Sequence, residues 1–183
     1  MLEGKNVNLR IIEREDLPVL HEWDNNPQFR GEYEPPKQET MAELERLYDG
    51  LKDSQWFFVE KKDGVKIGFI AHFLRAGETE LGYNIVSTER RKGYASEAIR
   101  IMVDYLFLSK DIIRIQAKAD PENLASWKAL ENSGFTREGI LRKTYYCRGE
   151  WRDDCMYSIL REEWKEPKTL TRTDKKQKDS VCY

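Results

Sequence analysis

The chain has 183 residues, with 31 Lys and Arg against 33 Asp and Glu and a formal charge of −2. This length suits a single domain with a sizeable core, and the near-balanced charge excludes a general nucleic-acid binder. Apolar residues make up 39% of the sequence, which argues against a disordered chain. No apolar stretch approaches the roughly 20 residues of a membrane span, and the N-terminus lacks the apolar centre of a signal peptide. We therefore expect a cytoplasmic protein with no nucleic-acid or membrane partner.

Cysteine and histidine, two common metal ligands, are scarce in the sequence. The cysteines are Cys147, Cys155 and Cys182, an odd number without metal-ligand spacing, and the histidines are His21 and His72. We therefore expect reduced thiols and no metal site.

The N-terminal part of the chain combines strand and helix patterns. Hydrophobic alternation predicts a first strand over residues 7–12, and a helix is expected over 17–25. Residues 29–36 contain Tyr33 and a Pro-Pro step, which predicts an irregular loop, either part of a substrate pocket or a plain surface connection. Apolar side chains three and four residues apart predict a second helix over 39–51.

The middle of the chain is rich in strands. Residues 55–60 and 66–74 are expected to form a hairpin, followed by a strand over 79–86. An amphipathic helix over 95–108 and a strand over 112–119 come next. This strand–helix–strand order predicts a right-handed βαβ unit with a parallel strand pair.

The C-terminal part begins with a short helix over 124–132. A strand follows over 135–143, and a last hairpin pairs 143–147 with 151–160. Residues 166–183 have no periodicity and few apolar side chains, so they are expected to form a flexible polar tail.

A basic turn at residues 90–96 connects the predicted strand 79–86 to the central helix. It contains Gly93, which lets the backbone approach a ligand closely. The first N–H groups of a helix have no intrahelical partner, and the helix dipole adds partial positive charge, so phosphate is the natural occupant. The alternative is an ordinary connecting loop with solvated basic side chains.

Three segments in this order resemble the GNAT-fold N-acetyltransferases. They are Arg-x-x-Gly-x-Ala at 90–95, Asp-Pro-Glu-Asn-Leu-Ala-Ser at 120–126 and Glu-Asn-Ser-Gly-Phe at 131–135. Within that family the chain looks like the RimJ/RimL branch, whose members acetylate protein N-terminal amines and various small amines. The resemblance implies one GNAT domain over residues 1–165. It also implies an α/β architecture of about seven mixed strands and about four helices, with a splayed strand pair at the cofactor site.

The resemblance implies acetyl-CoA as cosubstrate and no metal. The turn would bind the pyrophosphate through backbone N–H groups, and an N–H of the preceding strand would reach the thioester carbonyl. The expected cofactor-binding residues are Ile85, Val86, Arg90, Arg91, Lys92, Gly93, Tyr94, Ala95 and Ser96, together with Asn123 and Ser126.

Catalytic roles follow from the same resemblance. Asn123 would contact the pantetheine or thioester region, and Ser126 would donate a proton to the departing thiolate. The alternatives are a helix N-cap for Asn123 and solvated helix surface for Ser126. Many GNAT enzymes carry a tyrosine acid where this chain has Leu130, so the acid is Ser126 or another tyrosine, such as Tyr145.

The acceptor amine must lose a proton, and Glu80 and His72 are the candidate bases. The alternatives are a surface carboxylate for Glu80 and a core or pocket histidine for His72. A dedicated base is unnecessary if positioning alone lowers the barrier sufficiently. The expected substrate-binding residues are Tyr33, Trp56, His72 and Tyr83, with core positions as the alternative.

The predicted function is transfer of an acetyl group from acetyl-CoA to a primary amine, with a protein N-terminus as the first choice of acceptor. A small-molecule amine (a polyamine, an antibiotic or an aminoacyl conjugate) is the alternative within the same fold. A non-catalytic acyl-CoA-binding module is a third possibility, which Asn123 and Ser126 argue against. The enzyme is expected to be a monomer or a homodimer.

Overall fold

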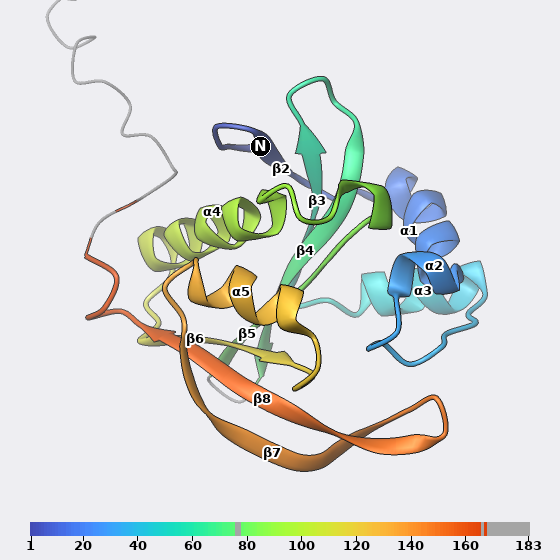
Figure 1. The fold of residues 1–183 in the computed structure, drawn as a ribbon. Coiled ribbons are helices and arrows are strands. Elements are labelled where there is room, and N and C mark those ends of the chain that lie inside the picture. The colour runs from blue at the N-terminus through green and yellow to red at the C-terminus, as the bar shows by residue number, and fades with distance from the viewer. Residues whose placement is uncertain (76–77, 166, 168–183) are drawn as a thin grey trace, which may run out of the picture.

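The computed structural model describes residues 1–75, 78–165 and 167, and these build one eight-stranded sheet with helices on both faces (Figure 1). The strand order is β1-β2-β3-β4-β5-β6-β8-β7. The strands are β1 (Leu2–Glu3), β2 (Val7–Ile11), β3 (Gln55–Lys61), β4 (Lys66–Arg75), β5 (Glu78–Ile85), β6 (Arg114–Ala119), β7 (Thr136–Cys147) and β8 (Glu150–Leu160). The helices are α1 (Leu17–Asp24), α2 (Pro27–Arg30), α3 (Met41–Asp49), α4 (Tyr94–Ser109) and α5 (Leu124–Glu131), with 3-10 turns at Arg14–Asp16 and Ser87–Glu89.

Side-chain alternation along the strands divides the interior into two cores. Figure 1 shows α4 and α5 on one side of the central strands and α1, α2 and α3 on the other. Phe57 of β3 packs in the large core with α4, whereas its neighbour Phe58 packs with α1 and α3. Because successive strand residues point to opposite faces, this adjacent pair supplies both cores.

The predicted βαβ unit is confirmed. β5 and β6 are parallel neighbours joined by α4, and the other adjacent strands in the sheet pair antiparallel. The central helix was expected over 95–108 and extends from Tyr94 to Ser109. Its buried face contains Ala98, Met102 and Leu106, as the spacing of three and four residues predicts.

Other predictions need correction. The expected loop over 29–36 begins inside a helical turn, because Asn26 accepts a hydrogen bond from the Gln28 N–H and Pro27 occupies the first helical position. β1 was not predicted, because two residues carry no readable alternation. The expected boundary between two strands at residue 143 is absent, because β7 continues to Cys147. The pairing of β7 with β8 instead contains two register shifts. The predicted tail lies outside the described residues, apart from residue 167.

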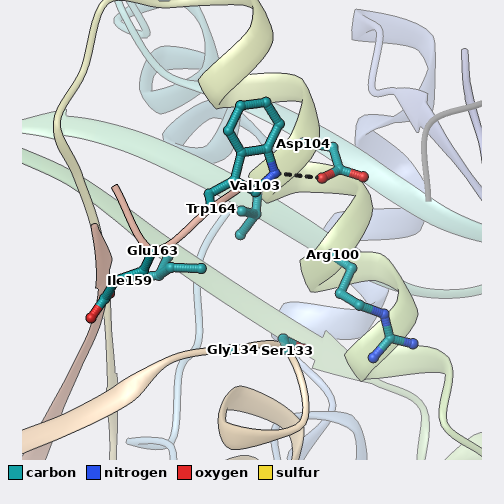
Figure 2. A pocket seen from close by; sticks show the side chains of 8 residues that line it. All are labelled: Arg100, Val103, Asp104, Ser133, Gly134, Ile159, Glu163 and Trp164. Carbon is teal, nitrogen blue, oxygen red and sulfur yellow. Dashed lines mark hydrogen bonds between the residues drawn. The ribbon is translucent and has the colours of Figure 1, made fainter. Parts of the chain in front are cut away.

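Trp164, near the end of the described chain, packs against α4. Its indole Nε1 donates to Asp104 Oδ1 at 2.8 Å, and its ring lies 5.4 Å from that of Phe107. Figure 2 shows the indole pointing to Asp104, with Arg100 further along the same helix. The adjoining cavity of about 40 Å³ has room for one or two water molecules rather than a substrate.

None of the helices in the described part of the chain combines the length and the hydropathy that crossing a membrane would require.

Replacing Trp164 by Phe keeps an aromatic ring on α4 but removes the donor to the buried Asp104 carboxylate. We expect the free energy of unfolding to fall by about 1–3 kcal/mol, since a buried acceptor loses a partner. Urea unfolding measures this loss. Trp151→Phe is the matched control, because Trp151 is exposed and should shift the midpoint little. Equal midpoints for the two variants would contradict the assigned role of Trp164.

Candidate active site

The turn before α4 has the backbone geometry of an anion site. Gly93 is the helix N-cap with φ of 84°, and Arg91 has φ of 61°. A Cβ built on Gly93 would meet no atom within 4 Å, so the glycine is required by its backbone angle and not by crowding. No acceptor among the described residues takes the backbone N–H groups of residues 91–96. These free donors at the start of a 16-residue helix attract an anion.

The three basic side chains of this turn differ in their roles. Lys92 pairs with Glu89 at 2.9 Å, and Arg91 is exposed beside it. The Arg90 guanidinium turns inward and donates to the carbonyls of Ile85, at 2.8 Å, and Phe29, at 3.0 Å. Arg90 was expected among the cofactor-binding residues, but its side chain instead ties the turn to β5 and α2.

β5 and β6 separate beside this turn. They pair only from Thr79–Ile115 to Leu81–Ala117, while β5 stays paired with β4 as far as Ile85. The second half of β5 therefore borders an opening in the sheet, as the expected splayed strand pair requires.

The structure distinguishes the two backbone N–H groups expected to reach the thioester carbonyl, those of Ile85 and Val86. The Val86 N–H donates to the Ile67 carbonyl on β4 at 2.8 Å. Because neighbouring strand residues direct their N–H groups to opposite edges, the Ile85 N–H points to the gap. Ile85 is therefore the donor available there, and Val86 is not.

Asn123 and Ser126 lie at the start of α5 on the other side of the gap. Asn123 Oδ1 accepts the Ser126 N–H at 3.1 Å, so Asn123 is a helix N-cap, the alternative that the sequence left open. Ser126 Oγ lies 2.7 Å from the Tyr83 hydroxyl of β5. Tyr83 was expected to line the acceptor site, but it faces α5 and spans the opening. Burial raises the pKa of Tyr83, so the phenol stays protonated at neutral pH.

The two other positions considered for a tyrosine acid do not provide one. Leu130 is fully buried in the large core. The Tyr145 hydroxyl donates to Asp120 Oδ2 at 2.5 Å, and Arg152 binds the same carboxylate at 2.6 Å. Burial and the neighbouring carboxylate both raise the pKa of Tyr145.

Glu80 lies on the opposite face of the sheet from Ser126. Leu81, Tyr83 and Ile85 face α4 and α5, so Glu80 points to the α1–α3 side, where its carboxylate pairs with Lys118 at 3.1 Å. The expected catalytic residues are therefore divided between the two faces, and the gap between β5 and β6 connects them.

Sequence reasoning missed two carboxylates on that side, Asp154 and Glu34. Burial raises the pKa of Asp154; Lys118 and a hydrogen bond from Thr144 oppose the shift, and nearby acids, including Glu80, add to it. Partial desolvation also raises the pKa of Glu34 and Asp154 adds to the shift, but the side chain is 55% exposed and its ion pair with Arg30 at 3.3 Å opposes the shift. No local pattern predicts this arrangement, because the residues lie far apart in the sequence.

A cavity of about 440 Å³ lies on the same side of the sheet, between the sheet and helices α1 and α3. Its sheet wall is aromatic, with Trp56, Phe69 and Phe73, and its polar wall includes Asp24 and Lys37. Trp56 was expected to bind substrate, and it lines this cavity. Its Nε1–H has no hydrogen-bond partner in the described part of the chain.

Tyr33 lies beside the start of α5 and not in this cavity. Its hydroxyl donates to the Glu122 carbonyl at 3.2 Å, and the Arg152 guanidinium lies 5.7 Å from its ring centre.

His72 is 1% exposed and lies in the interior below α4. Its Nε2 contacts Gln55 Oε1 at 3.3 Å, and the Tyr105 hydroxyl donates to the same oxygen at 3.0 Å. This placement favours the core-histidine alternative over the expected substrate contact. Burial, with a smaller effect of Lys110, lowers the pKa of His72 to about 4.

Comparison with known proteins gives concordant matches. The family profile described as "Acetyltransferase (GNAT) domain" matches residues 6–136. The uncharacterized N-acetyltransferase p20 of Bacillus licheniformis is 40% identical over 89% of this chain and 97% of its own length. Spermidine N(1)-acetyltransferase of Escherichia coli K12 is 30% identical over 90% of this chain and 91% of its own length. The structure of spermidine N-acetyltransferase from Vibrio cholerae with CoA and spermine superposes with a TM-score of 0.77 at 26% identity, covering 87% and 98% of the two chains.

Gly93→Ala should weaken CoA binding about tenfold, because an L-residue is strained at this backbone angle and its Cβ enters the open space of the turn. Isothermal titration calorimetry measures the Kd. Gly149→Ala is the matched control, since Gly149 has φ of 94° and equally open surroundings but lies in the β7–β8 turn. The same Kd for both variants would remove the turn from the cofactor site.

His72 predicts a pH dependence of stability. Its pKa is lowered from 6.5 to about 4 in the folded state, so the unfolded chain takes up a proton more readily between these values. Acidification from pH 6.5 toward pH 4 therefore destabilises the wild type through this residue. The His72→Gln variant lacks this acid-induced destabilisation. The difference in free energy of unfolding between the wild type and the variant should therefore become smaller as the pH falls. Chemical denaturation at several pH values measures the difference, and parallel curves would contradict the prediction.

Proposed function

Because the chain belongs to the GNAT family of acetyltransferases, we propose that its acceptor is a primary amine of a small polycation of the polyamine type. The coarser activity is established by the family: the protein is an acyltransferase that uses acetyl-CoA. The observation that carries the proposal is the set of carboxylates of Glu34, Glu80 and Asp154 on the α1–α3 side of the sheet gap.

The residues on the α4 side fit the cofactor. The free N–H groups of residues 91–96 and the charge of Arg91 suit the pyrophosphate, and the Ile85 N–H is available for the acyl carbonyl. Acetyl-CoA supplies an acetyl group activated as a thioester. The chain supplies anion binding at the helix start, an opening between β5 and β6, and polar groups on both sides of that opening.

The residues on the other side suit a cationic acceptor. A polyamine nitrogen arrives as an ammonium ion, and partly desolvated carboxylates bind it while helping to remove its proton. Because burial raises the pKa of Asp154, it is a better proton acceptor than an ordinary aspartate. We therefore assign the base role to Asp154, directly or through water, and substrate binding to Glu80.

The names of the relatives support this choice. The Escherichia coli relative is named a spermidine acetyltransferase, and the similar Vibrio cholerae structure contains spermine.

A protein N-terminal amine is the second candidate, as the RimJ/RimL-like pattern first suggested. The specific observation in its favour is the apolar cavity lined by Trp56, Phe69 and Phe73, which would accept an apolar side chain of a peptide.

The acceptor is identified by CoA thiol release with spermidine, spermine, an aminoglycoside and peptides with different N-terminal residues. We expect kcat/KM for spermidine to exceed that of every peptide at least a hundredfold. Preferred turnover of a peptide would overturn the polyamine proposal in favour of the second candidate.

Asp154→Asn should lower kcat/KM for spermidine about tenfold, because it removes a charge and the proposed proton acceptor. Asp153→Asn is the matched control: its carboxylate accepts the Lys143 N–H within the β7 irregularity, and activity should change less than twofold. Equal effects of the two substitutions would remove Asp154 from the acceptor site.

A further inference from the structure

The phenol of Tyr83 forms a direct contact across the sheet opening. Its oxygen lies 2.7 Å from Ser126 Oγ and 3.3 Å from the Ser126 carbonyl oxygen. Tyr83 is on the part of β5 that is not paired with β6, and Ser126 is in the first turn of α5. The two hydroxyl groups therefore link the unpaired part of β5 to the start of α5.

Ser126 alone is a poor source of a proton. The thiol that leaves acetyl-CoA is an alkyl thiol with a pKa somewhat above the value of about 8.5 for cysteine, whereas an aliphatic alcohol is a much weaker acid. Full transfer from an isolated serine would leave an alkoxide, a far stronger base than the thiolate that it protonates. A phenol, with an ordinary pKa of about 10, is much closer to the thiol. Burial raises the pKa of Tyr83 above this value, so its phenol is a weaker acid than free tyrosine but still a stronger one than an aliphatic alcohol.

We infer that Tyr83 supplies, through Ser126, the proton that the departing sulfur receives. The amine nitrogen forms its bond to the acetyl carbon and releases one proton toward the acceptor side. As the carbon–sulfur bond breaks, its electron pair stays on sulfur; Ser126 gives its proton to sulfur and takes the proton of Tyr83. The products are an amide, a free thiol and a tyrosinate, which recovers a proton from solvent. This inference rests on the proposed acetyl transfer, but not on the identity of the amine.

The surroundings of Tyr83 suit this cycle. Burial keeps the phenol protonated before reaction, and the bond to Ser126 opposes that effect on its pKa by stabilising the phenolate. The tyrosinate is therefore short-lived, and the phenol is restored before the next turnover. Leu130 and Tyr145 do not provide this acid, because one is a core residue and the other is committed to Asp120.

The test compares Tyr83→Phe, Ser126→Ala and the double variant in single-turnover release of CoA thiol. We expect each single substitution to lower the rate constant at least tenfold, with the KM for acetyl-CoA changed less than twofold. The double variant should be no slower than Ser126→Ala, because the two hydroxyls form one relay. Tyr105→Phe is the matched control; its hydroxyl bonds to Gln55 at 3.0 Å, and the rate should change less than twofold.

A second readout does not depend on turnover. The Kd values of CoA and desulfo-CoA, compared at pH 8 and at pH 10 as the thiol of CoA becomes ionised, report on hydroxyl groups facing the sulfur. We expect wild type to favour CoA at least fivefold, and Tyr83→Phe to reduce this preference to less than twofold.

Two results would overturn the inference: an unchanged single-turnover rate in Tyr83→Phe, or losses in the single variants that multiply in the double variant. An equal CoA preference in wild type and Tyr83→Phe would also overturn it. If wild type turned over none of the amines, the proposed function would fail, and the CoA preference would still decide whether Tyr83 and Ser126 face the sulfur.

Discussion

The site depends on how briefly β5 and β6 pair. Their parallel contact lasts from Thr79 to Leu81, while β5 continues along β4 to Ile85. Gly68 permits that continuation, because a Cβ at this position would lie 2.2 Å from the Asn84 carbonyl oxygen. The second half of β5 is therefore paired with β4 on one edge and unpaired on the edge that faces β6. The Ile85 N–H and the Tyr83 side chain lie on this unpaired part, beside an opening in the sheet. The anion-binding turn follows directly, because the same strand leads into it.

The opening separates two regions of opposite electrostatic character. On the α4 and α5 side, the start of α4 provides unpaired N–H groups and the positive end of a helix dipole. On the α1–α3 side, Glu34, Glu80 and Asp154 provide negative charge, partly offset by Lys118. A formal charge of −2 conceals this division, because composition averages over the two faces. Under the proposed function, an anionic cofactor and a cationic acceptor approach from opposite sides and meet at β5.

A buried ion pair fixes the geometry around the start of α5. Asp120 directly follows β6 and binds Arg152 of β8 at 2.6 Å, and Arg152 also binds Glu122 at 2.6 Å. Burial alone would raise the pKa of Asp120, but the bonds from Arg152 and Tyr145 outweigh it and the pKa is lowered. The carboxylate thus stays charged and holds the β7–β8 hairpin to the turn that positions Ser126.

The order of most elements, the glycine-containing turn at residues 90–96 and the Asn-x-x-Ser turn that opens α5 can be predicted from the sequence alone. These features depend on neighbouring residues: apolar spacing, a glycine at a helix start and a capping side chain are all local. Only the tertiary structure distinguished the Ile85 N–H from that of Val86, turned Arg90 inward, enclosed His72 and brought Tyr83 to Ser126. Each of these outcomes depends on strand register or on a contact between distant segments, 43 residues apart for Tyr83 and Ser126. Periodicity tells which face a side chain takes, but it does not tell which residue it meets there.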